Sequence, residues 1–175
     1  MQPFFDPLHN LIKNQELWLM ERTLSYAKAH GYTAYTSTLL EAWRVSICGL
    51  SSPLLAALEI LPDIAPLEPG CNYREDPIAG FGVKEARQHR ARGVTLELFL
   101  GLFKYYRQAY LDVVALGDFT QDQQQQFLIL IHRFFDRIEL GFCHEWMSLS
   151  EQQMLTELQT KNREVTNEKK GAFHL

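Results

Sequence analysis

Apolar residues recur every three or four positions along the second half of the chain, as they do on one face of an α-helix. All seven prolines lie at or before Pro77, so the rest of the chain holds none of the residue that most strongly interrupts helices. No segment shows sustained alternation of apolar and polar residues, and no Asn-Gly or Asp-Gly pair predicts a hairpin. We therefore expect an all-α fold.

Capping residues, prolines and glycines predict the helix boundaries in the first half of the chain. Asp6-Pro7 is expected to open a short helix, and Gly31 to end a second helix that starts near Gln15. A capping box at residues 38–41 predicts a third helix, which reaches Gly49 or Leu50. Further boundaries are expected at Ser52-Pro53, which opens a separate short helix ended by Pro62, and over residues 62–76, which form the main irregular loop.

Three helices are expected in the second half. Gly80 and Gly82 weaken the first turns after Asp76-Pro77, so we expect helix only from Val83 to Arg92, ended by Gly93. Thr95 can cap a helix over residues 96–116, which Gly117 closes, and a capping box at residues 120–123 opens a last helix that can reach the C-terminus.

The last two helices are expected to supply most of the core. Two adjacent apolar stripes on residues 96–116 predict a central helix with neighbours on two sides. They comprise Phe99, Phe103, Tyr106, Tyr110 and Val113 on one side, and Leu98, Leu102, Tyr105 and Ala109 on the other. The last helix is apolar on most sides between Phe127 and Phe142. It is therefore either fully buried or shared between the core and a partner subunit.

The chain changes character near residue 150, which divides it into a helical domain over residues 1–150 and a polar linker over residues 151–175. Leu155, Leu158, Asn162 and Val165 are spaced by three, four and three, which is typical of the a and d positions of a coiled coil. An Asn at such a position fixes the register of two strands. The alternative is a solvated helical tail. Residues 148–151 are a candidate kink or restart before this segment.

Composition narrows the class of protein. The chain has 175 residues, 46% of them hydrophobic, which is enough for one packed domain and excludes intrinsic disorder. A net charge of −4 argues against a nucleic-acid partner, and no apolar run reaches the roughly 20 residues of a membrane span. With three dispersed cysteines and no signal-peptide pattern at the N-terminus, we expect a cytoplasmic protein that does not insert into membranes.

The usual catalytic and metal-binding motifs are missing from the sequence. It contains no Cys-x-x-Cys, His-Glu-x-x-His, Gly-x-Ser-x-Gly or phosphate-binding Gly-x-x-x-x-Gly-Lys pattern. We therefore expect no catalytic residues and no metal site in this chain.

The densest polar cluster lies between residues 84 and 92 and has three interpretations. It is a solvated face on which Glu85 and His89 pair across one helical turn. Alternatively, it docks an anion or an acidic partner through its cations, Lys84, Arg87, Arg90 and Arg92. In the third interpretation His89 is an axial ligand of a haem iron, because imidazole is the proximal ligand in globins.

Two stretches resemble a known family. The run His89–Arg107, HRARGVTLELFLGLFKYYR, resembles the N-terminal sensory domains of bacterial sensor histidine kinases, which are similar to the globin-like input domains of stressosome regulators. The run Glu157–Lys170, ELQTKNREVTNEKK, is similar to the helical linkers that join such domains to a following module. Together they cover about a fifth of the chain.

The resemblance implies a globin-like, homodimeric input domain of a two-component signalling protein, with a PAS or kinase module following in the parent chain. Such a domain relays the presence of a ligand or partner through its last helix and performs no chemistry itself. His89 and Gly93 match the position of the proximal histidine and its glycine in globin-coupled sensors. Because the stressosome relatives have lost haem, we expect no cofactor, and a haem or small-ligand protein with His89 as ligand is the alternative.

Overall fold

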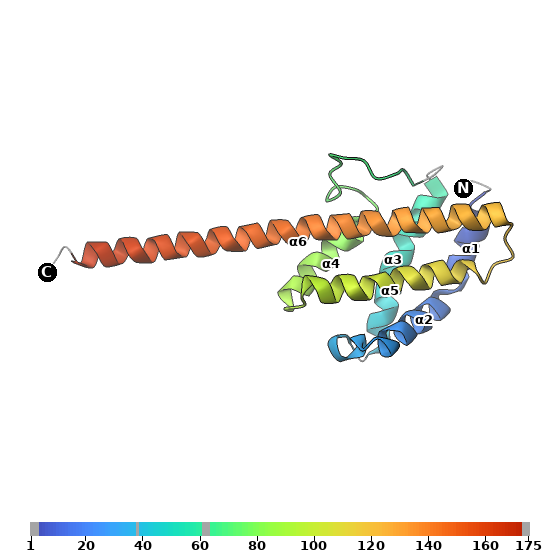
Figure 1. Ribbon diagram of the computed structural model, residues 1–175, viewed down its shortest axis with the longest axis horizontal. Helices are drawn as coiled ribbons and strands as arrows, with labels where there is room; N and C mark the ends of the chain where they lie inside the picture. The colour runs from blue at the N-terminus through green and yellow to red at the C-terminus, as the bar shows by residue number, and fades with distance from the viewer. Residues whose placement is uncertain (1–3, 38, 61–63, 173–175) are drawn as a thin grey trace.

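The computed structural model describes residues 4–37, 39–60 and 64–172, without the side chains of residue 60 and residues 164–172. This part of the chain is all-helical and contains no strand, as the sequence predicts. The elements are α1 (Asp6–Asn14), α2 (Glu16–Ala29), the short 3-10 helix η1 (Tyr32–Tyr35), α3 (Leu40–Ile60), α4 (Gly80–Ala91), α5 (Leu96–Val114) and α6 (Gln121–Ala172), shown in Figure 1.

Most predicted boundaries are confirmed to within two residues. Gly31 and Gly93 follow α2 and α4 with φ of +76° and +74°, the left-handed conformation that ends helices. The Thr95 hydroxyl accepts a hydrogen bond from the Leu98 amide, and Thr120 and Gln123 form the predicted capping box. Asp6 lies inside the first turn of α1 instead of capping it, because the N-cap residue is Phe5.

The division of residues 40–60 into two helices was wrong. They form one helix, α3, with Pro53 inside it. Leu50 before the proline, and Leu54 and Leu58 after it, have almost fully buried side chains. Their burial offsets the hydrogen bond that a proline removes from a helix, about 3 kcal/mol in an exposed helix. Thr38, the first residue of the capping box, and Pro62 lie outside the described residues.

The core forms where α5 and α6 run side by side, with α1, α2 and α3 packed across them (Figure 1). Both expected stripes of α5 contribute to it, and Phe103, Tyr110 and Val113 are almost fully buried. The apolar part of α6 is buried as well, with no exposure at Phe127, Ile131, Phe134, Phe135, Ile138 and Phe142. Most of the apolar part of α6 therefore belongs to the core of a single chain, while Leu128 and Ile129 are only partly buried.

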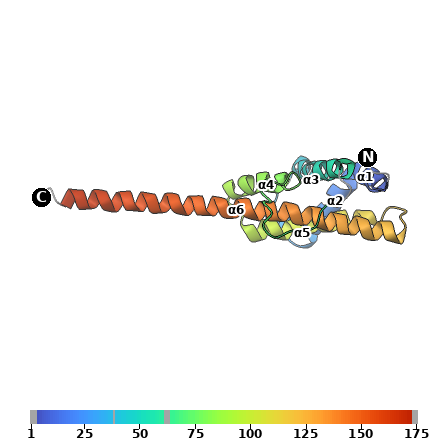
Figure 2. The same ribbon diagram turned by 90° about the horizontal axis from the view of Figure 1, so that it is seen from above.

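Beyond this core α6 continues as a single rod, which Figures 1 and 2 show projecting from the rest of the molecule. The helix runs without interruption through residues 148–151, so the expected kink or restart there was wrong. Every side chain from residue 151 to residue 163 is exposed. We call residues 4–150 the body and residues 151–172 the extension. Within the described residues, no helix has the length and apolar character that crossing a membrane requires.

Candidate functional site

The extension leaves the body where α4 packs against α6, and this junction is built on a close approach of the two helices. A Cβ added to Gly82 in α4 would lie 2.2 Å from the carbonyl O of Ile138 in α6. Any side chain larger than hydrogen therefore forces the helices apart. The glycine explains why α4 starts at Gly80 and not at the expected Val83, because the packing against α6 outweighs its weak helix propensity.

A buried carboxylate ties α6 to two segments that precede it. Glu145 is 1% exposed, and its Oε1 accepts a hydrogen bond of 2.7 Å from Nε of Arg87 in α4. Nε of Arg74, in the loop before α4, lies 2.6 Å from Oε2 in an ion pair. The guanidinium groups of Arg74 and Arg87 remain partly exposed to water, whereas the carboxylate of Glu145 is buried. The two arginines therefore offset the cost of burying this carboxylate while keeping part of their own hydration. From the sequence alone, His144-Glu145 is interpreted as a packed or surface histidine beside a solvated glutamate, and the burial of Glu145 shows that this interpretation of the glutamate was wrong.

Arg90 bridges α4 to the first turn of the extension. Its Nη1 donates to Oγ of Ser150 at 2.7 Å, and its Nη2 donates to Oε1 of Gln153 at 3.1 Å. Its guanidinium also lies over the ring of Trp146, 5.2 Å from the centroid. Arg90 therefore connects α4 to the last turn of α6 in the body and to the first turn of the extension.

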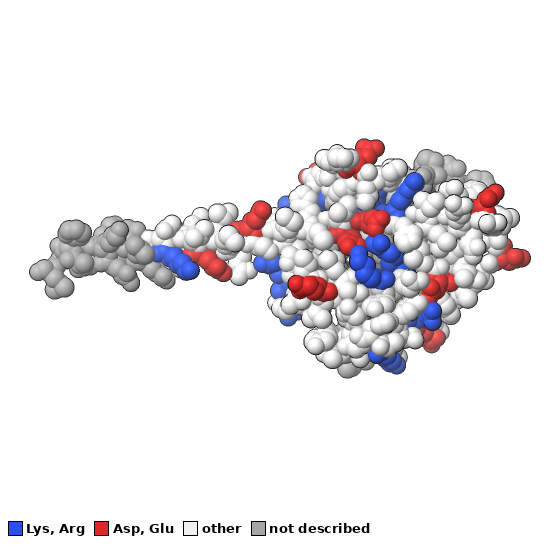
Figure 3. Space-filling view, viewed as in Figure 1, with Lys and Arg blue, Asp and Glu red and all other residues white. Residues whose placement is uncertain are grey.

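These contacts change the interpretation of the basic cluster. Arg87 and Arg90 bind α6 of their own chain, while Arg92 donates to the carbonyl O of Gln88 in α4. Lys84 is exposed on α4. The four cations are therefore not one open docking face. On the side of the molecule seen in Figure 3, acidic and basic side chains are likewise intermixed.

His89 lines a cavity of about 80 Å³ between α3, η1, α4 and α5. Nδ1 of His89 lies 2.9 Å from the carbonyl O of Glu85 and 3.2 Å from its Oε2, so the expected pairing across one turn is present. Nη2 of the exposed Arg92 lies 3.4–3.5 Å from both ring nitrogens. The other walls come mainly from aromatic and aliphatic side chains of α3, η1 and α5.

The cavity has one feature of a haem pocket and lacks another. An Nδ1–H donating to a backbone carbonyl leaves Nε2 as the metal-binding nitrogen, as second-shell contacts do for ligating histidines. Pockets for drug-sized ligands measure about 300–1,000 Å³. A cavity of about 80 Å³ does not fit a porphyrin. Within the described residues, no group of three or more His, Cys, Asp and Glu side chains is placed to hold a metal ion.

A chain of aromatic rings in contact, the first edge to face and the others stacked, connects this cavity to the start of the extension. The ring of His89 meets the ring of Phe99 at 4.8 Å between centroids. Phe99 stacks on Phe142 of α6 at 3.7 Å, and Phe142 stacks on Trp146 at 5.5 Å. A change at His89 or Phe99 therefore reaches α6 through direct contacts, one turn before the extension begins.

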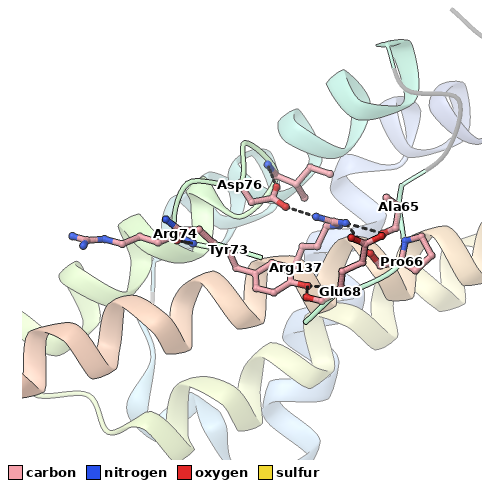
Figure 4. Close-up of polar contacts among 9 residues, drawn as sticks. Ala65, Pro66, Glu68, Tyr73, Arg74, Asp76 and Arg137 are labelled. Carbon is pink, nitrogen blue, oxygen red and sulfur yellow. Dashed lines mark hydrogen bonds and ion pairs between the residues drawn. The ribbon is translucent and has the colours of Figure 1, made fainter. Parts of the chain in front are cut away.

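The expected loop before α4 is confirmed over its described residues, and Arg137 of α6 holds it (Figure 4). Arg137 points from α6 toward the loop, where its guanidinium pairs with Asp76 and donates to the carbonyl O of Ala65 and of Pro66. Asp76 in turn accepts from the amide of Ile78, just before α4. The loop is thereby fixed along α6 up to the start of the junction.

The extension carries the residues expected in a coiled coil. Leu155 and Leu158 are 59% and 53% exposed, Asn162 is exposed, and the side chain of Val165 lies outside the described residues. Three further exposed apolar side chains on α6 were missed, which are Leu140, Met147 and Met154. Their spacing of seven was the available signal. It was overlooked because Leu140 and Met147 fall in the part of α6 that looked like core.

Comparison of the sequence with models of protein families, with curated proteins and with solved structures found no match.

Proposed function

We propose that this chain is a non-catalytic input domain of a bacterial signal-transduction protein of the sensor histidine kinase type. A ligand or partner biases the packing of the body, and α6 carries the change to an output module. Such a module, of PAS or kinase type, follows in the parent protein. The proposed setting is the cytoplasm, without insertion into a membrane.

The continuity of α6 is the observation that supports this proposal best. The same helix contributes Phe135 and Phe142 to the core and Leu158 to the exposed extension, with no break between them. A helix that is packed at one end and free at the other transmits a rotation or a shift of its packed end. The junction with α4 fixes the position of this helix where it leaves the body.

The proposed partner of the extension is the extension of a second copy of the chain. A helix without tertiary contacts is marginally stable in water, yet every side chain from residue 151 to residue 163 faces solvent in the single chain. Pairing two extensions about a twofold axis buries the same apolar face on both. In a parallel pair, Leu155, Leu158, Asn162 and Val165 each meet their own copy.

Dimerisation is tested by placing charge in this seam. Leu155→Asp and Leu158→Asp are expected to convert a dimer of the full chain to a monomer in sedimentation equilibrium. Thr156→Asp and Thr160→Asp, on other faces of the same helix, are matched controls expected to remain dimeric. Leu158→Cys is expected to cross-link to its own copy on oxidation. A wild-type monomer, or seam variants that stay dimeric, would contradict the pairing.

Relay is tested by the helical phase of the extension. The chain is fused through α6 to the kinase module of a dimeric sensor kinase, and single residues are inserted after position 163 up to one full heptad. We expect kinase activity to vary with the number of inserted residues and to return when a heptad is complete. Activity that ignores the phase would contradict a relay through α6.

The haem alternative from the sequence has a separate test. The hydrogen bond from His89 to the Glu85 carbonyl favours it, but a haem needs a much larger cavity than the one formed here. An absorption spectrum of freshly purified protein decides whether the chain binds haem. A Soret band that disappears in His89→Ala would assign haem, and a colourless protein that ignores added haem would exclude it.

A further inference from the structure

The walls of the cavity beside His89 are rich in aromatic rings and contain a single carboxylate. Six rings from η1, α4 and α5 line it, which are those of Tyr32, Tyr35, Phe81, Phe99, Phe103 and Tyr106. Glu85 supplies the carboxylate, and no Lys or Arg is among the described lining residues. Aromatic faces attract cations through their quadrupole, and an aromatic cage with an acidic group is a known way to recognise an ammonium ion.

Glu85 is available to a positively charged ligand. Its side chain is 15% exposed, and Oε2 lies 3.2 Å from Nδ1 of His89 in an ion pair that requires a protonated imidazole. A neutral imidazole leaves the negative charge of the carboxylate uncompensated. Arg92 contacts the imidazole from an exposed position, and its positive charge competes with that of a ligand.

Hydroxyl groups in the cavity wall add hydrogen-bond acceptors. Oγ1 of Thr36 is buried and has no hydrogen-bond partner in the structure, which costs free energy unless a ligand donates to it. Oγ of Ser46 donates to the carbonyl O of Ala42 and retains its own acceptor capacity. An ammonium N–H is a suitable donor for both hydroxyls.

The volume of the cavity limits the size of its occupant. A cavity of about 150 Å³ holds a benzene molecule, which has six non-hydrogen atoms, so about 80 Å³ holds about three. We propose that this cavity is a binding site for a small organic ammonium ion that keeps N–H groups, of the size of the ethylammonium ion. Its role as the stimulus rests on the proposed function, whereas the binding itself does not.

The position of the site gives binding a direct route to α6. The bound cation contacts Phe99, and Phe99 stacks on Phe142 in the last core turns of α6. An occupied cavity restricts the motion of Phe99 and so changes the relative stability of the packings available to α6.

The experiment titrates the full chain with ethylammonium chloride and, in parallel, with ethanol, which has nearly the same shape and a hydrogen-bond donor but no charge. Sodium chloride at equal concentration controls for ionic strength. We expect amide shifts in NMR that saturate with a Kd of about 1 mM for the ammonium ion, and binding about ten-fold weaker for the alcohol. The shifts are expected at residues that line the cavity.

Three variants sharpen the assignment. Glu85→Gln is expected to weaken ammonium binding about ten-fold, and Arg92→Gln to strengthen it a few-fold by removing the competing charge. Glu97→Gln, at an exposed position in the first turn of α5, is the matched control and is expected to bind as the wild type does. Ser46→Leu, which fills the cavity, is expected to abolish binding and stands in for Glu85→Gln should that variant not fold.

Equal binding of the ion and the alcohol, or ammonium binding unaffected by Glu85→Gln in a folded protein, would overturn the proposed ligand class. Shifts elsewhere than the cavity, or none, would overturn the site. Sedimentation of the same samples separates this result from the proposed function. A dimer that binds no ammonium ion refutes only the site, and a monomer that binds it refutes only the proposed pairing of the extensions.

Discussion

The part of α6 that lies in the body and the extension belong to one helix, but their apolar side chains have different surroundings. In the body, Phe134, Phe135 and Ile138 are completely buried by helices of the same chain. In the extension, Met154, Leu155 and Leu158 are each more than half exposed. Since helical propensity varies little between residues of this kind, the difference lies in tertiary contacts. The body buries these apolar side chains within one chain, whereas the extension would bury its own only in the pairing proposed above.

The largest expected contrast comes from truncating one apolar side chain in each region. Phe135→Ala removes contacts with the rings of Phe103 and Tyr110, each 5.2 Å away between centroids, and is expected to lower the free energy of unfolding by about 3–5 kcal/mol. Leu158→Ala is expected to change it by less than about 0.5 kcal/mol in protein dilute enough to be monomeric. Urea unfolding measures both. Similar losses in the two variants would mean that the extension packs on the body.

The next effect concerns the buried carboxylate that fixes α6 to α4 and to the preceding loop, just before the extension begins. Glu145→Gln removes the charge that Arg74 and Arg87 share, and is expected to cost about 1.5–3 kcal/mol because the side chain is buried. Glu16→Gln breaks the exposed pair with Arg44 and is expected to cost less than about 1 kcal/mol. Urea unfolding compares the two. Equal losses would show that burial of Glu145 contributes nothing to the junction.

A comparable effect is expected from the close approach of α4 to α6. The Cβ of Gly82→Ala meets the carbonyl O of Ile138, which is expected to displace α4 and to cost about 1–3 kcal/mol. Gly80→Ala is the matched control, because nothing lies within 4 Å of its added Cβ, and a few tenths of a kcal/mol of stabilisation are expected. Thermal unfolding measures both. A Gly82→Ala variant as stable as Gly80→Ala would contradict the helix contact.

The smallest expected effect is a pH-dependent loss of stability at Asp112 of α5, which is outside the contact between α4 and α6. Partial burial acts to raise the pKa of Asp112, but hydrogen bonds from Tyr26, Gln108 and Arg22 outweigh it and lower this pKa below its ordinary value. The stability that the lowered pKa supplies is complete above the unfolded value of about 3.9 and is lost as the pH falls through the folded value.

Asp112→Asn is therefore expected to cost about 1 kcal/mol or less at pH 7 and clearly less near pH 2. Urea midpoints at the two pH values measure the change. Asp118→Asn, at an exposed position, is the control and is expected to show no such difference. A cost that stays constant down to pH 2 would contradict the role of the Asp112 charge.

Much of the fold could be predicted from the sequence because its signals are local. Thr95, Gly93 and the capping box at Thr120 act within one turn of the backbone, and the apolar stripes of α5 follow from helical spacing alone. Pro53 and Gly82 were misinterpreted for the same reason. Their local preferences oppose a helix, and contacts with distant parts of the chain outweigh them.

The candidate site could be predicted only in part. His89 and the basic cluster stand out in the sequence, but the pairing of Arg87 with Glu145 spans 58 positions and leaves no local pattern. The stack from Phe99 to Phe142 is equally long-range. The apolar pattern of the extension was visible, whereas its exposure in a single chain, which makes a second copy the expected partner, needed the structure.

Hydrogen exchange along α6 at a series of protein concentrations tests most directly whether the extension pairs with a second copy. We predict slow exchange for amides 127–148 at every concentration, and protection of amides 152–163 that increases with protein concentration. Fast exchange in the extension at all concentrations, as in a solvated tail, would contradict the account.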